Sequence, residues 1–144
     1  MRMRKRLTLA ILALGFLSAP IQLFAQEAKI EPPKVLAVMF HADWCSTCKV
    51  LEPKINQVKR DFQNQPVLFT QFDLTDDFTK DQAARYAALL GLEDLYRENS
   101  NKTGFMFLIE WPSKRVLGKI TKEKTPEQIK SMLTHSQMGH PVGD

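Results

Sequence analysis

The only two cysteines of the chain are Cys45 and Cys48, and they lie where an apolar run passes into a helical pattern. Residues 35–40 are six apolar residues in succession, which is typical of a strand buried on both faces. After Cys48, apolar residues recur at the spacing of a helix with one buried face, at Leu51, Ile55, Val58 and Phe62. The cysteine pair is therefore expected at a strand-to-helix junction.

The rest of the chain continues this alternation of strands and helices. Three further strands are predicted from apolar runs, over residues 67–72, 105–109 and 115–120. Between the first two of these runs, the alanine-rich residues 81–90 predict a helix and the polar residues 93–103 predict a loop. The resulting order predicts an α/β domain, with a mixed sheet of about four strands flanked by helices.

The boundaries of the domain are predicted from its first strand and its last helix. A final helix is predicted from a capped helix start, formed by Thr125, Pro126 and Gln128. The folded domain is therefore predicted over residues 35–136. The polar residues 26–34 are interpreted as a lead-in segment, and residues 137–144 as a flexible tail.

The first 25 residues have the features of an export signal. The apolar residues 7–17 follow four positive residues, and Ala25 offers a small side chain for cleavage. An uncleaved membrane anchor is the alternative, because residues 7–25 carry no charge. Either interpretation predicts that the folded part is periplasmic or otherwise exported, in a compartment where disulfides form.

The positive charge of the chain comes from this leader. The net charge is +4, and Arg2, Arg4, Lys5 and Arg6 account for all of it, so the remainder has equal numbers of positive and negative residues. A neutral remainder has no bulk attraction for nucleic acid, which excludes a nucleic-acid-binding protein. After the leader, about 119 residues remain, enough for one compact domain.

The predicted position of Cys45 at a helix start favours its thiolate. The first turn of a helix leaves backbone N–H groups unpaired and carries the positive end of the helix dipole. Both stabilise an anion on the sulfur. Cys48 lies one turn further along, where it can resolve a mixed disulfide on Cys45. The spacing therefore predicts a redox-active pair.

Three other interpretations of the pair stay open at this point. A structural disulfide over this spacing removes only about 2 kcal/mol of unfolded-state entropy and joins nothing distant. A metal site would lack a second cysteine pair, and its best form here is copper held by thiolates and His41. The third is a binding module in which the pair has no redox function.

Residues 42–49 (Ala-Asp-Trp-Cys-Ser-Thr-Cys-Lys) are followed by Pro53, which is expected to kink the helix. With the preceding strand, this motif resembles the thioredoxin family, specifically its exported bacterial members, over roughly residues 30–136. The resemblance implies a thioredoxin fold, with Cys45 as nucleophile, Cys48 as resolving thiol and Trp44 as a shield for the site. It implies no cofactor.

The sequence departs from the pattern of that family in several places, among them the Ser46-Thr47 pair, which replaces the common Gly-Pro between the cysteines. Thr103 and Gly104 stand where family members usually have a cis-proline beside the cysteines, and Met39 stands where many have a buried acid. The helix and loop over residues 76–103 are enlarged. The strand and helix that open the family's fold have little room before Val35, so the N-terminal part is reduced.

Side chains around the pair are candidate active-site neighbours. His41 can favour the Cys45 thiolate as an imidazolium, or it can be a packing residue. Asp43 is predicted to cap the helix. The hydroxyls of Ser46 and Thr47 can hydrogen-bond the Cys45 sulfur or face solvent.

The predicted function is that of an exported thiol–disulfide oxidoreductase that exchanges disulfides with protein partners. The resemblance slightly favours the reducing direction. It implies disulfide-containing or dithiol proteins as substrates and a membrane-bound redox partner as the source of electrons. The alternative is a non-catalytic module on the same fold that binds a partner or delivers copper.

Overall fold

The computed structural model describes residues 31–143, so the predicted leader and most of the lead-in segment lie outside the described residues. None of the helices in this part is long and apolar enough to cross a membrane. The elements are β1 (Val35–His41), α1 (Ser46–Lys59), the 3₁₀ helix η1 (Arg60–Phe62), β2 (Val67–Asp73), α2 (Asp77–Leu90), α3 (Glu93–Asn99), β3 (Phe105–Glu110), β4 (Val116–Thr121) and α4 (Pro126–Ser136).

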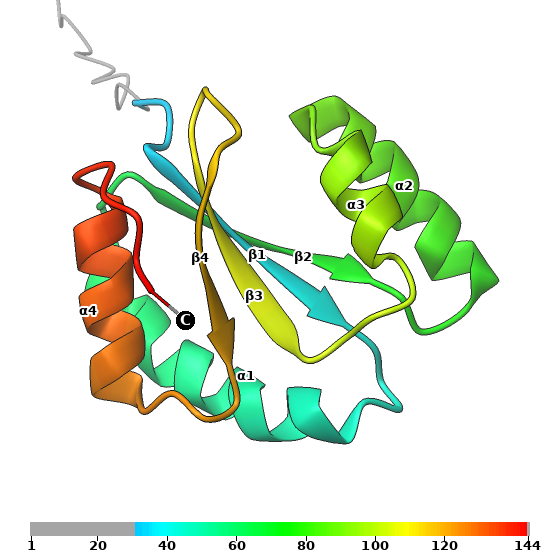
Figure 1. Cartoon of the computed structure of the whole chain (residues 1–144). Helices are drawn as coiled ribbons and strands as arrows, with labels where there is room; N and C mark the ends of the chain where they lie inside the picture. Colours follow the sequence, from blue (N-terminus) through cyan, green and yellow to red (C-terminus); the bar gives the residue numbers. More distant parts are fainter. Residues whose placement is uncertain (1–30, 144) are drawn as a thin grey trace, which may run out of the picture.

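The four strands form one mixed sheet in the order β2-β1-β3-β4 (Figure 1). β1 pairs parallel with β2 and antiparallel with β3, and β3 pairs antiparallel with β4. The α/β class predicted from the sequence, a mixed four-stranded sheet flanked by helices, is confirmed.

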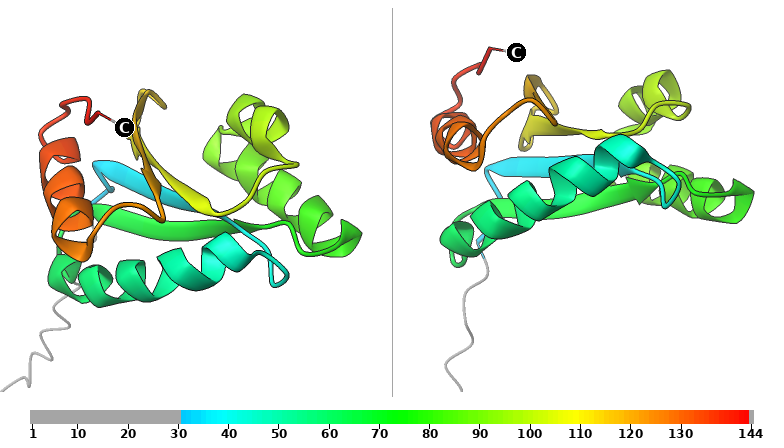
Figure 2. Two further views of the ribbon diagram at one scale, coloured as in Figure 1. Left: turned by 60° about the horizontal axis from the view of Figure 1, so that its bottom comes forward. Right: turned by 90° about the horizontal axis from the view of Figure 1, so that it is seen from below.

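Helices cover both faces of this sheet, so β1 is buried on both sides (Figure 2). Alternate residues of a strand point to opposite faces. Val35, Ala37 and Met39 accordingly belong to the core cluster that includes side chains of α1 and α4. The residues that alternate with them along β1 are Leu36, Val38 and Phe40. They belong to a second cluster, together with side chains of α2 and α3.

α1 begins directly after Cys45, carries Cys48 in its first turn and is held in place further along. Its buried side chains are Cys48 and three members of the predicted stripe, Leu51, Ile55 and Val58. Phe62, the last member of that stripe, is buried in η1. Pro53 lies inside the helix and cannot donate a hydrogen bond to the Lys49 carbonyl. The ammonium group of Lys54 donates to the carbonyls of Lys122 and Lys124, at 3.1 Å from the latter. These bonds tie the middle of α1 to the segment between β4 and α4.

The loop predicted over residues 93–103 is wrong in its first part, where α3 forms a helix. The polar composition concealed a buried face, because Tyr96 and Asn99 lie three residues apart and both point into the protein. The hydroxyl of Tyr96 donates to the Lys80 carbonyl of α2 at 2.7 Å. Burial, and to a smaller extent the charge of Asp81, raises the pKa of Tyr96.

Capping boxes begin two of the helices. Thr125 and Gln128 cap α4 reciprocally, as the sequence predicted. α2 begins at Asp77, four residues before its predicted start, because Asp76 and Thr79 form a second capping box. This box has threonine in place of the usual acidic or amide residue, which explains why the earlier start was missed.

Within residues 137–143, Val142 contacts the rest of the domain. The amide of Val142 donates to the Leu117 carbonyl of β4 at 2.7 Å. Its side chain packs against the cluster under α1 and α4. A Cβ atom at Gly118 would lie 2.7 Å from the Val142 carbonyl oxygen, so this close approach of the two backbones requires glycine.

Candidate active site

Cys45 is the N-cap residue of α1, and its sulfur takes the role of a capping oxygen. The backbone N–H of Cys48 donates to Cys45 Sγ at 3.1 Å. The predicted capping role of Asp43 is therefore wrong, because the helix begins two residues later than an Asp43 cap would place it. A backbone N–H aimed at the sulfur, together with the positive end of the helix dipole, stabilises the thiolate of Cys45 after reduction.

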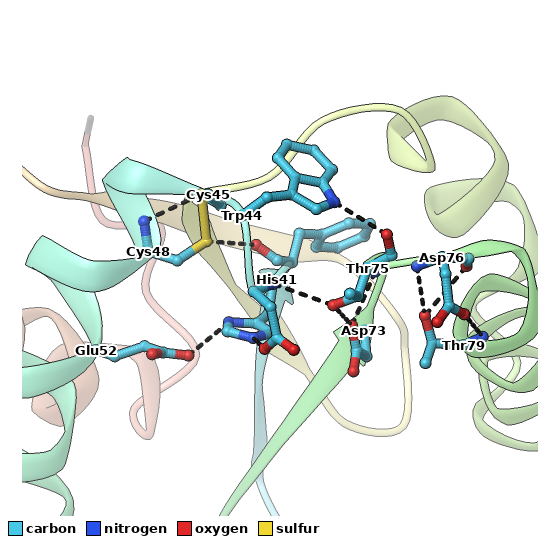
Figure 3. A network of polar contacts seen from close by, with 11 residues as sticks. His41, Trp44, Cys45, Cys48, Glu52, Asp73, Thr75, Asp76 and Thr79 are labelled. Carbon is cyan, nitrogen blue, oxygen red and sulfur yellow. Dashed lines mark hydrogen bonds and ion pairs between the residues drawn. A yellow bond between two sulfur atoms is a disulfide. The ribbon is translucent and has the colours of Figure 1, made fainter.

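The two cysteines form a disulfide, with Cα atoms 5.3 Å apart (Figure 3). Cys45 is 5% exposed and Cys48 is fully buried. Cys48 Sγ lies 3.9 Å from the Phe40 carbonyl oxygen, an acceptor for its S–H in the reduced state. The two sulfurs thus differ in environment, because one faces a helix N–H and the other a strand carbonyl.

The segment between β2 and α2 is tied to the loop that carries the cysteines. The indole Nε1–H of Trp44 donates to the Thr75 carbonyl at 3.0 Å, and the Asp43 amide donates to Thr75 Oγ1 at 3.0 Å. Thr75 is fixed in turn by Asp73, whose carboxylate accepts from its amide and its hydroxyl (Figure 3). Trp44 precedes Cys45 in the chain and remains 62% exposed, so much of its side chain is open to solvent.

His41 faces two carboxylates. Its Nδ1 lies 2.6 Å from Glu52 Oε1, an ion-pair distance whose geometry is not that of a linear hydrogen bond. Its Nε2 lies 3.3 Å from Asp43 Oδ1. The ring is mostly buried, with its side chain 12% exposed. A protonated imidazole can pair with both carboxylates at once, and neither of these contacts involves a cysteine sulfur.

The backbone of Gly104 lies beside Cys45 Sγ, at the position where thioredoxin-family members usually have a cis-proline. It has φ +89, and a Cβ atom there would lie 2.6 Å from Thr47 Cβ and 3.4 Å from Cys45 Sγ. Its amide donates to the Phe40 carbonyl at 2.8 Å. Thr103, half-buried, precedes it at the entry to β3. The cis X-Pro bond of the described residues is at Pro112, beyond the other end of β3.

The two residues between the cysteines have different environments. Ser46 is exposed, whereas Thr47 is half-buried with its side chain against Gly104. Within residues 31–143, the hydrogen bond to the Cys45 sulfur comes from the Cys48 amide and not from either hydroxyl. Thr47 therefore contributes packing to the site.

The sequence interpretation missed Glu52, Thr75 and the contact between Thr47 and Gly104. Glu52 could have been found, since it lies four residues after Cys48 and so on the same side of α1. Thr75 is 31 residues from the Trp44 ring that it holds, and its position depends on the pairing of β1 with β2. Residues 31–143 contain no group of three or more His, Cys, Asp or Glu side chains that could hold a metal ion.

Comparisons with known proteins agree with this architecture. The thioredoxin family model matches residues 22–88. A thioredoxin from Echinococcus granulosus is 37% identical over 62 residues, which are 43% of this chain and 54% of that protein. The chain therefore spans about half the length of this curated relative. Both matches are similarities to thioredoxins over less than half of this chain, and the stretch matched by the family model includes Cys45 and Cys48.

A solved structure extends the comparison over more of the chain. Thioredoxin-2, described as a component of the malaria parasite protein secretion machinery, aligns with a TM-score of 0.50 at 15% identity. The alignment covers 74% of this chain and 86% of that one. At this identity the likeness shows the thioredoxin fold alone.

Proposed function

We propose that this chain is an exported thiol–disulfide oxidoreductase that exchanges disulfides with protein partners through Cys45 and Cys48. The observation that carries the proposal is the geometry of the pair, with Cys45 Sγ as the N-cap of α1 and 3.1 Å from the Cys48 amide. This arrangement lowers the energy of a thiolate on Cys45 and keeps a second sulfur within bonding distance.

In the reducing direction, the Cys45 thiolate attacks one sulfur of a partner disulfide. A new S–S bond forms between Cys45 and the partner, and the other partner sulfur leaves as a thiolate that takes a proton from water. Cys48 then loses its proton and attacks Cys45 Sγ. The internal disulfide forms, the second partner sulfur leaves, and two electrons have passed to the partner. A dithiol protein at the membrane would return the pair to its reduced state.

The difference in burial supports the order of these steps. Cys45 follows the exposed Trp44 in the chain and retains a small exposed surface, whereas Cys48 has none. A partner can therefore reach Cys45 and cannot reach Cys48. In this proposal Trp44 contacts the partner, and Thr103 and Gly104 present backbone beside the Cys45 sulfur. His41, with Glu52 and Asp43, sets the charge around the pair.

The proposal is tested by replacing each sulfur separately and following the reduction of a protein disulfide. Cys45→Ser is expected to abolish turnover, because no attacking thiolate remains. Cys48→Ser is expected to trap a mixed disulfide with the partner, visible by mass spectrometry, because the resolving step is lost. Ser46→Ala, at the exposed position between them, is the matched control and should keep turnover within about twofold.

Two results would contradict the exchange of disulfides through Cys45 and Cys48. One is turnover that survives Cys45→Ser, and the other is a Cys48→Ser protein that forms no adduct.

Equilibration with glutathione then gives the reduction potential. A potential near that of strong oxidants such as DsbA, about −120 mV, would reverse the reducing direction while leaving the exchange chemistry in place. Recovery of the protein in the cytoplasmic fraction of its cell would contradict export.

A further inference from the structure

β2 forms one edge of the sheet, and its outer side is free of any other strand in residues 31–143 (Figures 1 and 2). The Pro66 carbonyl accepts from the Val35 amide, and the Leu74 amide donates to the His41 carbonyl, so even-numbered residues of β2 bond to β1. Successive residues of a strand direct their N–H and C=O groups to opposite sides. The backbone groups of Phe69 and its odd-numbered neighbours therefore point outward.

This edge lacks the features that usually prevent strand pairing. Its seven residues keep an uninterrupted register with β1, without a bulge or a proline. Asp73, at its end, is its only charged residue. Proteins generally protect exposed edges with lysine, proline or bulges. The opposite edge of the sheet shows such protection, since β4 has a register irregularity against β3 and is covered by Val142.

The surface beside β2 is hollowed on both of its sides. One hollow is lined by residues of α1, η1 and β2, including Lys59, Arg60 and Val67. Another is lined by residues of β2 and α2, including Gln71, Asp73 and Tyr86. An added strand would find room between the helices, with space for its side chains above and below.

Charges of opposite sign flank the two ends of the edge. Lys59 and Arg60 lie at the Val67 end, and within the described residues neither is in an ion pair. Lys59 Nζ lies 5.5 Å from the centre of the Phe69 ring. Asp61, the acidic residue nearest to Arg60 in the sequence, forms an ion pair with Lys130 of α4 at 2.7 Å.

The other end of the edge is acidic. Asp73 lies there, and Glu52 of α1 lines a hollow together with Gln71. Glu52 is engaged by His41, and one oxygen of Asp73 accepts from Thr75. The edge therefore has Arg60 at its basic start and Asp73 at its acidic end, while Lys59 also lines the hollow that holds Glu52 and Gln71.

From these observations we infer that β2 pairs antiparallel with β2 of a second copy of this chain, around a two-fold axis at Thr70. In this arrangement Phe69 of one copy lies opposite Gln71 of the other, and the outward backbone groups of both strands are paired. The basic end of each edge meets the acidic end of its partner. The two sheets join into one of eight strands.

The test uses the purified protein in the form in which it accumulates in its own compartment. Sedimentation velocity over a range of concentrations is expected to show a monomer–dimer equilibrium. Amide hydrogen exchange at Phe69, Gln71 and Asp73 is expected to slow as the dimer fraction rises.

Gln71→Pro removes an outward N–H and leaves the bonds to β1 intact. It should raise the dimer dissociation constant about ten- to hundredfold, because two hydrogen bonds are lost per dimer. Gln71→Ala is the matched control and should dimerise as before.

Arg60→Glu tests the pairing of charges between the two copies. Arg60 is exposed, so the substitution should not disturb folding. It should weaken the dimer severalfold at low salt, with the difference shrinking at about 0.5 M salt. The inference is overturned by a protein that stays monomeric at about millimolar concentration with these amides unprotected, which would point to a strand from another protein. Protection that does not depend on concentration would indicate a segment of the same chain and would also overturn it. So would a dimer that persists unchanged in Gln71→Pro.

Discussion

The two sides of the disulfide hold it by different means. On one side, where β1 ends and α2 begins, the contacts are polar and link His41, Asp43 and Thr75 to their partners. On the other side, the backbone of Gly104 and the side chain of Thr47 meet in close packing. Packing forces rise steeply over tenths of an ångström, whereas charge interactions fall off gradually and are screened by salt. The packed side therefore fixes the sulfur position, and the polar side adjusts its charge.

The packed side should be the more sensitive of the two. Gly104→Ala places a methyl group 2.6 Å from Thr47 Cβ at a residue with φ +89. We expect the free energy of unfolding of the oxidised protein to fall by about 2–4 kcal/mol, from overpacking and from the backbone conformation together. Urea unfolding measures this change.

Gly91→Ala is the control for that substitution. Gly91 also has positive φ, +67, but a Cβ atom there would make only an ordinary contact, 3.5 Å from Lys114 Cε. Gly91→Ala should lower the free energy of unfolding by about 1 kcal/mol. Equal losses in the two variants would show that the contact with Thr47 contributes nothing, and that the comparison between the two sides has no basis.

The next largest effect is expected at Thr75 on the polar side. Thr75→Val removes the acceptor of the Asp43 amide and the hydroxyl that donates to Asp73. The free energy of unfolding should fall by about 1–2 kcal/mol, because two hydrogen bonds are lost. Thr134→Val is the control, since that hydroxyl makes one exposed bond to a carbonyl within α4. If both variants unfold at the same urea concentration, the segment before α2 is not held by Thr75.

The smallest effect is expected from a change of charge alone. Asp43→Asn removes a negative charge two residues from Cys45 without changing the shape of the loop. The reduced protein should react with iodoacetamide about twice as fast at fixed pH, because the Cys45 thiolate is repelled less. High salt should remove the difference. Asp94→Asn on α3, also strongly exposed, should leave the rate unchanged. A gain that persists at high salt would indicate a structural cause.

Features encoded by neighbouring residues could be predicted from the sequence. The strand-to-helix junction at the cysteines follows from a change in apolar spacing, and the start of α4 follows from Thr125 and Gln128. The N–H contact to Cys45 Sγ also follows locally, because it arises within the first turn of α1. These parts required no knowledge of the tertiary structure.

Features that depend on distant residues could not be predicted. The sequence of α3 predicts a loop because its polar residues outnumber the two that it buries, and that burial depends on contact with α2. Gly104 was recognised only as a position without proline. Its contact with Thr47 joins residues 57 positions apart and becomes visible when β3 lies beside β1. The Val142 contact with β4 is of the same kind.

The bonds from Lys54 to the segment before α4 have a consequence for the proposed redox cycle. They hold α1 in place just after Pro53, about two turns beyond the disulfide. Reduction of the disulfide therefore releases only the first turn of α1, while the rest of the helix stays packed against the sheet. Oxidised and reduced protein should share one scaffold, and a partner that distinguishes the two forms must do so at the tip of α1.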